Sequence, residues 1–213
     1  MPSMNRHVLV AALLALVAVA PAATAAPRFE VTPFAGYRSG GEFDTQQTAD
    51  GQSTTVDLED GSSWGIDLGL YRDSNSFYEL LYATQSTSLD SRDPLYGGID
   101  IQTDYYQFGG TIFFADEQWL IPYLSLTAGV TRFSADGGLG SETKFSTSLG
   151  GGLRLPFGEN FAATLGLRGY LTFVESDTDF FCVSGSGEAG CLLKSSGGTY
   201  FQGEALLGLT FRF

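Results

Sequence analysis

Residues 201–213 read FQGEALLGLTFRF, and this stretch decides the fold class. Its odd-numbered positions are all apolar or small, whereas its even-numbered positions include Gln202, Glu204, Thr210 and Arg212. A period of two residues sends alternate side chains to opposite faces, which is the geometry of a β-strand and not of a helix. The stretch therefore predicts a strand with one apolar face and one polar face.

Seven further segments show the same alternation, namely residues 29–38, 64–71, 77–85, 105–114, 120–133, 145–157 and 161–173. The connections between them alternate in length. Residues 72–76, 115–118 and 158–160 are short, whereas residues 39–63, 86–104, 134–144 and 174–199 are long. Short turns at one end and long loops at the other are typical of outer-membrane barrels. We therefore expect an all-β chain that forms an eight-stranded antiparallel up-and-down transmembrane β-barrel.

A soluble secreted β-sandwich or lipocalin-like barrel would also alternate, but it would carry charges on its outer face. Here the face that bears the aromatics has no charge near the strand centres. A basic side chain facing lipid at mid-depth costs about 2–4 kcal/mol. Aromatic residues gather at strand ends, as in the two girdles of membrane barrels. They are Phe29, Tyr37, Trp64, Tyr78, Phe114, Phe145, Phe157, Phe161, Phe173, Phe201, Phe211 and Phe213.

The first 26 residues differ from the rest of the chain. Arg6 and His7 precede the apolar run 8–20, and the small residues 23–26 follow it. This order is typical of a cleaved secretory signal peptide. A transmembrane helix is the alternative, but it needs about 20 apolar residues, and Pro21 interrupts this run. We expect a signal peptide over residues 1–26 and a barrel domain over residues 27–213.

The charge balance and the histidine content exclude several classes of function. Eleven basic residues face 24 acidic ones, a net charge of −13, and a nucleic-acid partner would require a basic face. The single histidine, His7, lies in the expected signal peptide, so the mature chain has no Ser-His-Asp arrangement. Lys144 and Lys194 lie at or in loops, where we do not expect the desolvation that activates a catalytic lysine. We expect no enzyme, no cofactor and no metal centre.

The loops leave two questions open. Acidic residues crowd the long loops, as in residues 42–60 and 175–179, so they form either a divalent-cation site or a solvated acidic surface. Cys182 and Cys191 lie nine positions apart in a Gly/Ser-rich stretch. In an exported chain such a pair predicts a disulfide. A metal site would need further soft ligands, which the mature chain lacks.

Because alternate residues of a strand face opposite sides, the positions of one set of charged residues predict that their side chains point into the barrel. The interior of an eight-stranded barrel is only wide enough for side chains to fill it, and unpaired buried charges are costly. We therefore expect a paired network, with Glu79 joined to Arg168 or Arg154. It would act either as a polar plug or as a gated path. The set is Glu30, Arg38, Asp67, Glu79, Arg154, Arg168, Glu204 and Arg212.

The eight alternating segments, the Pro122-Tyr123 opening of the fifth segment, and Phe211 with Phe213 at the end resemble the small outer-membrane β-barrel family. This family includes the OmpA transmembrane domain and the OmpX and OmpW types. The resemblance implies a monomer in the outer membrane of a Gram-negative cell, in contact with lipid and lipopolysaccharide. It also implies that the barrel assembly machinery reads Phe211 and Phe213. The expected role is non-enzymatic, structural or surface-interacting through the acidic loops; the alternative is a narrow, porin-like path for small solutes.

Overall fold

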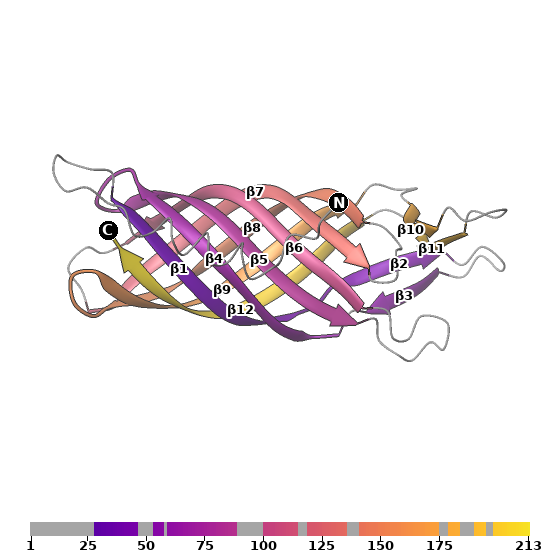
Figure 1. The fold of residues 1–213 in the computed structure, drawn as a ribbon, viewed down its shortest axis with the longest axis horizontal. Coiled ribbons are helices and arrows are strands. Elements are labelled where there is room, and N and C mark those ends of the chain that lie inside the picture. Colours follow the sequence, from indigo (N-terminus) through magenta and orange to yellow (C-terminus); the bar gives the residue numbers. More distant parts are fainter. Residues whose placement is uncertain are drawn as a thin grey trace, which may run out of the picture.

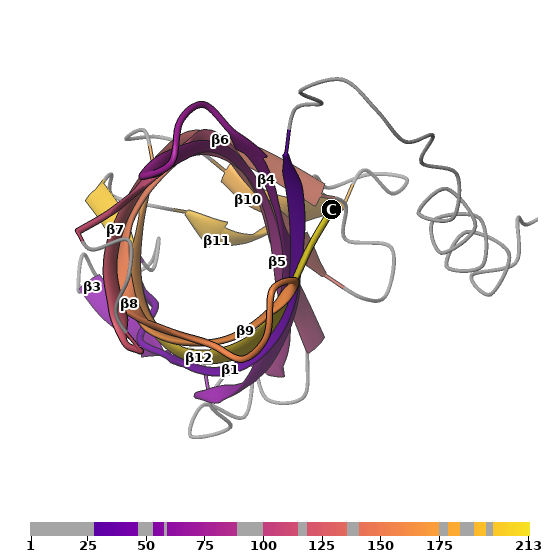
Figure 2. The same ribbon diagram turned by 90° about the vertical axis from the view of Figure 1, so that its left-hand side faces the viewer.

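The computed structural model describes residues 28–46, 53–57, 59–88, 100–114, 119–135, 141–174, 179–183, 190–194 and 198–213. The expected signal peptide, residues 1–26, lies outside this part of the chain. Eight strands close into one antiparallel barrel in the order β1-β12-β9-β8-β7-β6-β5-β4 (Figures 1 and 2). They are β1 (Phe29–Ser39), β4 (Gly61–Tyr71), β5 (Ser76–Ser88), β6 (Asp100–Phe113), β7 (Ile121–Ala135), β8 (Ser141–Pro156), β9 (Phe161–Val174) and β12 (Gly198–Arg212). The predicted fold class is confirmed.

Strand β1 closes the barrel because it pairs on both of its edges. Tyr37 lies opposite Ala205 of β12, and Ala35 lies opposite Trp64 of β4. Full closure leaves no unpaired strand edge, which is what a β-structure in hydrocarbon requires. The view along the barrel in Figure 2 shows the resulting ring of strands.

Two small hairpins extend past one end of the barrel, in segments whose sequence predicts only loops. One consists of β2 (Glu42–Gln46) and β3 (Ser53–Asp57), and the other of β10 (Asp179–Val183) and β11 (Gly190–Lys194). Each of these strands has five residues and little apolar alternation, so the pattern that marks a membrane strand is missing. We call this end of the barrel the loop end and the opposite end the turn end (Figure 1).

The barrel strands are also longer at the loop end than predicted. Strand β6 begins at Asp100 instead of Tyr105, and β8 begins at Ser141 instead of Phe145. The added residues are polar on the outward face as well, so they continue the strand beyond the apolar band without showing its alternation. Hydrophobic patterning therefore marks the membrane-facing part of a strand and misses the part that rises above it.

Local side-chain chemistry explains the turn end. In the turn between β4 and β5, Asp73 accepts hydrogen bonds from the Ser76 hydroxyl at 2.7 Å and from the Asn75 amide at 2.9 Å. These two bonds lower the pKa of Asp73 below its ordinary value. In the turn between β8 and β9, Gly158 has a φ of +83°, a conformation that L side chains rarely adopt.

The outward face of the barrel is apolar. All twelve residues predicted to form the aromatic girdles have exposed side chains, which confirms their outward orientation. Between them the strand centres present exposed leucines and other apolar residues to the surroundings. Examples are Leu80, Phe108, Leu126, Leu149, Leu165, Leu167 and Leu207. In the described part of the chain, no helix is long and apolar enough to cross a membrane.

Candidate functional site

The candidate site is the barrel lumen together with its mouth at the turn end. Six of the eight predicted lumen charges are buried, while Asp67 and Arg212 are partly exposed. The structure groups them in three layers that follow one another along the barrel. Tyrosine, threonine, serine and glutamine side chains fill the space between the charges.

The loop-end layer is built on Arg38 of β1 and Glu204 of β12. The Arg38 Nη2 atom lies 2.9 Å from the Glu204 Oε1 atom, and neither side chain is exposed to solvent (0% and 0%). The two residues are also register partners, so the backbone pairing itself brings the charges together. Ser63 donates a hydrogen bond to the same Oε1, and the Tyr170 hydroxyl donates to Oε2 at 2.7 Å. The carboxylate is thus fully coordinated, as a buried charge requires.

Aromatic rings hold the Arg38 guanidinium in place. Its central carbon lies 5.0 Å from the centroid of the Tyr105 ring and 4.7 Å from that of the Tyr170 ring. The two rings stack on each other with centroids 4.2 Å apart. Such cation–π contacts are stronger when the groups are desolvated. Further hydrogen bonds run from Tyr105 to Gln202 at 2.9 Å and from Gln202 to Gln85 at 3.2 Å.

The middle layer contains the pair that the sequence analysis expected Glu79 to form. The Arg168 Nη2 atom donates to the Glu79 Oε1 atom at 2.6 Å, and Nη1 donates to the Ser148 hydroxyl at 3.1 Å. Thr111 donates to the other oxygen of Glu79. Of the two arginines considered for Glu79, the structure pairs it with Arg168, because Arg154 binds a different carboxylate.

Asp67 lies between the middle layer and the turn-end layer without a direct partner on one oxygen. Its Oδ1 atom is buried and accepts no hydrogen bond in the described structure. Asp67, Arg154 and Arg168 line a cavity of about 30 Å³. A cavity needs about 10–15 Å³ of this kind of volume to hold a water molecule, so water fits beside the carboxylate.

The turn-end layer is centred on Glu30, whose carboxylate is shared by several donors. Arg154 binds it in bidentate fashion, with nitrogen–oxygen distances of 2.6 and 3.0 Å. The Tyr71 hydroxyl donates to the Oε2 atom at 2.6 Å, and the Arg212 Nε atom lies 3.8 Å from the same oxygen. The Arg154 guanidinium also lies 4.4 Å from the centroid of the Phe113 ring.

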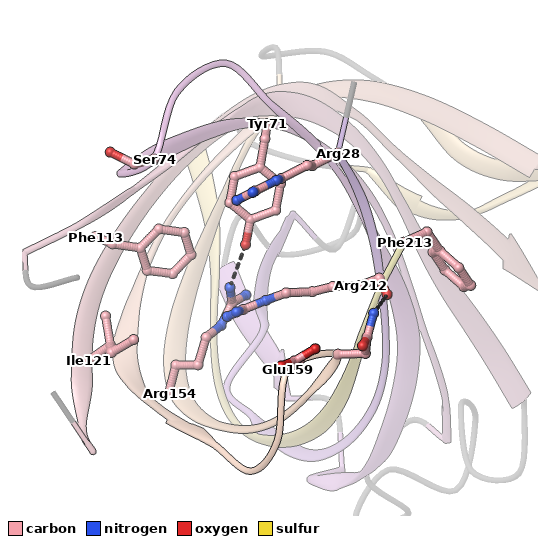
Figure 3. A pocket seen from close by; sticks show the side chains of 10 residues that line it. Arg28, Tyr71, Ser74, Phe113, Ile121, Arg154, Glu159, Arg212 and Phe213 are labelled. Carbon is pink, nitrogen blue, oxygen red and sulfur yellow. Dashed lines mark hydrogen bonds between the residues drawn. The ribbon is translucent and has the colours of Figure 1, made fainter. Parts of the chain in front are cut away.

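Below this layer the barrel opens into a mouth cavity of about 500 Å³, shown in Figure 3. Three arginine side chains extend into the cavity from different sides, namely those of Arg28, Arg154 and Arg212. One wall of the cavity is formed by Phe113 and Ile121. Glu159 lies on the turn after β8 and lines the same cavity. We call this cavity, with Arg28, Arg154, Arg212, Tyr71 and Glu159 around it, the turn-end mouth.

Sequence reasoning missed several residues of the lumen. Tyr71, Tyr105 and Tyr170 are among them, because an uncharged ring gives no signal in the sequence that it completes an ion pair. Arg28 precedes the first predicted strand, residues 29–38, by one position. Extending the inward parity of Glu30 by two positions would have found it.

The backbone register of the hairpin β10–β11 bears on the predicted disulfide. The side chains of Cys182 and Cys191 lie outside the described part, but the backbone of β10 places Cys182 opposite Cys191 of β11. Directly opposed residues in an antiparallel pair have Cα atoms about 4.5–5.5 Å apart, and a disulfide requires about 4.4–6.8 Å. The backbone register therefore agrees with the bond, which stays a prediction. Among the described side chains, no group of three or more His, Cys, Asp or Glu residues is arranged to hold a metal.

Residues 9–213 match the family described as "Outer membrane protein beta-barrel domain". The chain belongs to this outer-membrane β-barrel family. The family and the location in the outer membrane, both expected from the sequence, are therefore confirmed. A search of curated proteins gives no significant match.

Solved structures of other outer-membrane β-barrels share the fold. Neisserial surface protein A has a TM-score of 0.56 at 16% identity, covering 87% of this chain and 97% of that one. OprG from Pseudomonas aeruginosa has a TM-score of 0.56 at 11% identity, covering 88% and 96%. AlkL, solved in lipid bilayers, has a TM-score of 0.55 at 15% identity, covering 92% and 95%. At such identities the likeness concerns the fold alone.

Proposed function

We propose that this outer-membrane β-barrel protein is a closed, non-enzymatic scaffold that displays its acidic loops at the cell surface. The observation that supports the proposal most directly is the complete burial of Arg38 and Glu204 inside the loop-end part of the lumen. A water-filled path would expose the side chains along its wall to solvent. Instead Tyr105, Tyr170 and Gln202 beside this pair are at most 1% exposed.

The energetics of the ion pairs also favour a closed lumen. Each of the three layers satisfies a buried carboxylate with two or more donors, and removing one partner of a buried pair costs about 3–5 kcal/mol. Opening a path would separate several of these pairs together. A narrow channel for small solutes is the alternative function, and it would require the layers to rearrange.

The proposed interaction at the cell surface depends on the negative charge of the long loops. In outer-membrane barrels the long loops face outward, and here their sequences carry the main acidic runs. Glu59 and Asp60, just before β4, are exposed at the loop end. Such a surface attracts cationic partners at low ionic strength, and salt screens the attraction. In the same proposal Phe211 and Phe213 serve assembly, and the barrel is a monomer in contact with lipid and lipopolysaccharide.

Attachment of intact cells to polylysine-coated beads tests the interaction. Cells that display the wild-type protein should attach more strongly than cells with Glu59→Gln and Asp60→Asn. The matched control is Asp73→Asn with Glu159→Gln, which removes one Asp and one Glu at the turn end. That control should attach like the wild type. Equal attachment by the loop variant and the wild type would contradict a loop-mediated role.

A further inference from the structure

We propose that the turn-end mouth binds the phosphate or carboxylate group of a small anionic molecule that enters from the periplasmic side. The chain has a net charge of −13 and only 11 basic residues, yet three arginines line this one cavity. The site is independent of the proposed scaffold role, because it lies at the opposite end from the loops.

The inner part of the site carries excess positive charge. Arg154 and Arg212 are both within 4 Å of the Glu30 Oε2 atom, at 3.0 and 3.8 Å, so two guanidinium groups share one carboxylate. Glu30 itself is only 2% exposed and is covered by Arg154 and Tyr71. An incoming anion therefore meets the guanidinium groups before it meets the carboxylate.

Unused hydrogen-bond donors point to the same conclusion. The Nε atoms of Arg154 and Arg212 are buried and have no hydrogen-bond partner in the described structure, and the Arg154 side chain is 95% buried. The same holds for the Nε atoms of Arg38 and Arg168 deeper in the lumen, but of these four arginines only Arg154 and Arg212 line the turn-end mouth. Buried polar groups in proteins are nearly always satisfied, so each exception calls for a partner. An oxyanion accepts several such bonds at once, and the planar guanidinium fork suits phosphate and carboxylate.

Arg28 and Glu159 also line the turn-end mouth and add one positive and one negative charge. Arg28 forms no ion pair with a described residue, and it lines the mouth, into which its side chain extends in Figure 3. Glu159 on the facing turn offsets one positive charge. The side-chain charges of the three arginines, Glu30 and Glu159 sum to plus one.

The size of the cavity indicates more than a bare ion. Its volume of about 500 Å³ lies within the range of small-molecule sites, about 300–1,000 Å³. Phe113 and Ile121 give it an apolar wall on the side of Arg154, across the mouth from Arg212. The fitting ligand is an anionic group on a small organic molecule, either soluble or the headgroup of a periplasmic-leaflet lipid.

Calorimetric titration of the refolded chain in an uncharged detergent, with inorganic phosphate and pyrophosphate as probes at constant ionic strength, tests the site. We expect saturable one-to-one binding. Arg28→Gln and Arg212→Gln should each weaken it about tenfold, or about 1.4 kcal/mol. Glu159→Gln should strengthen it, since it removes the opposing charge. Arg132→Gln, the same substitution on β7 near the loop end, should leave it unchanged.

Repeating the titration in nanodiscs that contain phosphatidylglycerol distinguishes a soluble anion from a lipid headgroup as the ligand. Loss of phosphate binding there identifies a lipid headgroup as the occupant, and retained binding identifies a soluble anion. If Arg212→Gln fails to fold, Arg28→Gln alone decides, because its side chain forms no ion pair within the described structure. The proposal is overturned if the wild type shows no saturable binding, or if Arg132→Gln weakens binding as much as Arg28→Gln.

Discussion

Arg38 and Glu204 form an ion pair with no solvent-exposed surface on either side chain. Their strands, β1 and β12, lie at opposite ends of the sequence and next to each other in the barrel, so the pair also marks where the barrel closes. A pair in this position ties the first strand of the barrel to the last.

The first prediction concerns this pair. Glu204→Gln leaves the Arg38 charge buried without a counter-ion, which should lower the free energy of unfolding by about 3–5 kcal/mol. Urea unfolding in lipid vesicles measures it. The matched control is Glu142→Gln, since Glu142 lies 3.8 Å from Lys144 in a partly exposed pair. Exposed pairs contribute about 0–1 kcal/mol. Equal losses in the two variants would contradict the assigned role of Glu204.

The second prediction concerns Glu79 and Asp67. Glu79→Gln should lower thermal stability, because Arg168 loses its carboxylate partner in the middle layer. Asp67 lines the same small cavity as Arg168 and can take over part of that role. Adding Asp67→Asn should therefore cost more than the sum of the single variants, with a coupling of about 0.5–3 kcal/mol. Unchanged stability in Glu79→Gln, or strict additivity, would argue against a shared network.

The third prediction concerns the lipid-facing wall. Leu167 is 70% exposed and lies near the middle of β9. Leu167→Arg should destabilise the barrel by about 2–4 kcal/mol in a bilayer, whereas Phe157→Arg at the turn end should cost about 0–1 kcal/mol. Unfolding in vesicles compares the two. A soluble barrel would tolerate both changes, so equal and small effects would contradict the membrane orientation.

The fourth prediction concerns Cys182 and Cys191, which the backbone register places opposite each other. Protein isolated from the outer membrane should resist thiol alkylation until a reductant is added. After reduction it should accept two alkyl groups, as mass spectrometry would show. Alkylation of both cysteines without reductant would show that the bond is absent.

Much of the fold could be predicted from the sequence, because each membrane strand must turn every second side chain, an apolar one, toward lipid. Alternation identified all eight barrel strands, and the turn and loop lengths indicated their order. The extensions above the membrane and the hairpins β2–β3 and β10–β11 carry no such alternation in their sequences, since none of them needs an apolar face toward lipid. Their residues therefore looked like loop.

The candidate site was less predictable, for a different reason. Parity assigned the eight charges to the lumen, but pairing depends on the shear of the barrel and on side-chain reach. Arg154 and Arg168 lie on neighbouring strands with the same parity, yet one binds Glu30 and the other Glu79. The turn-end mouth depends on Arg28 and Glu159, which lie outside the barrel strands. Arg28 continues the inward parity of Glu30 beyond the predicted strand, whereas Glu159 lies in a turn and follows no periodic pattern.

Planar-bilayer conductance tests the closed lumen most directly. The sample is refolded protein whose folded state is verified by its heat-dependent shift on a gel. For the wild type we predict no discrete conductance steps. An Arg38→Ala, Glu204→Ala double variant, which removes the loop-end pair together with its bulk, should conduct more often. Discrete steps from the verified wild-type protein would contradict the closed scaffold and would make the channel the better description of its function.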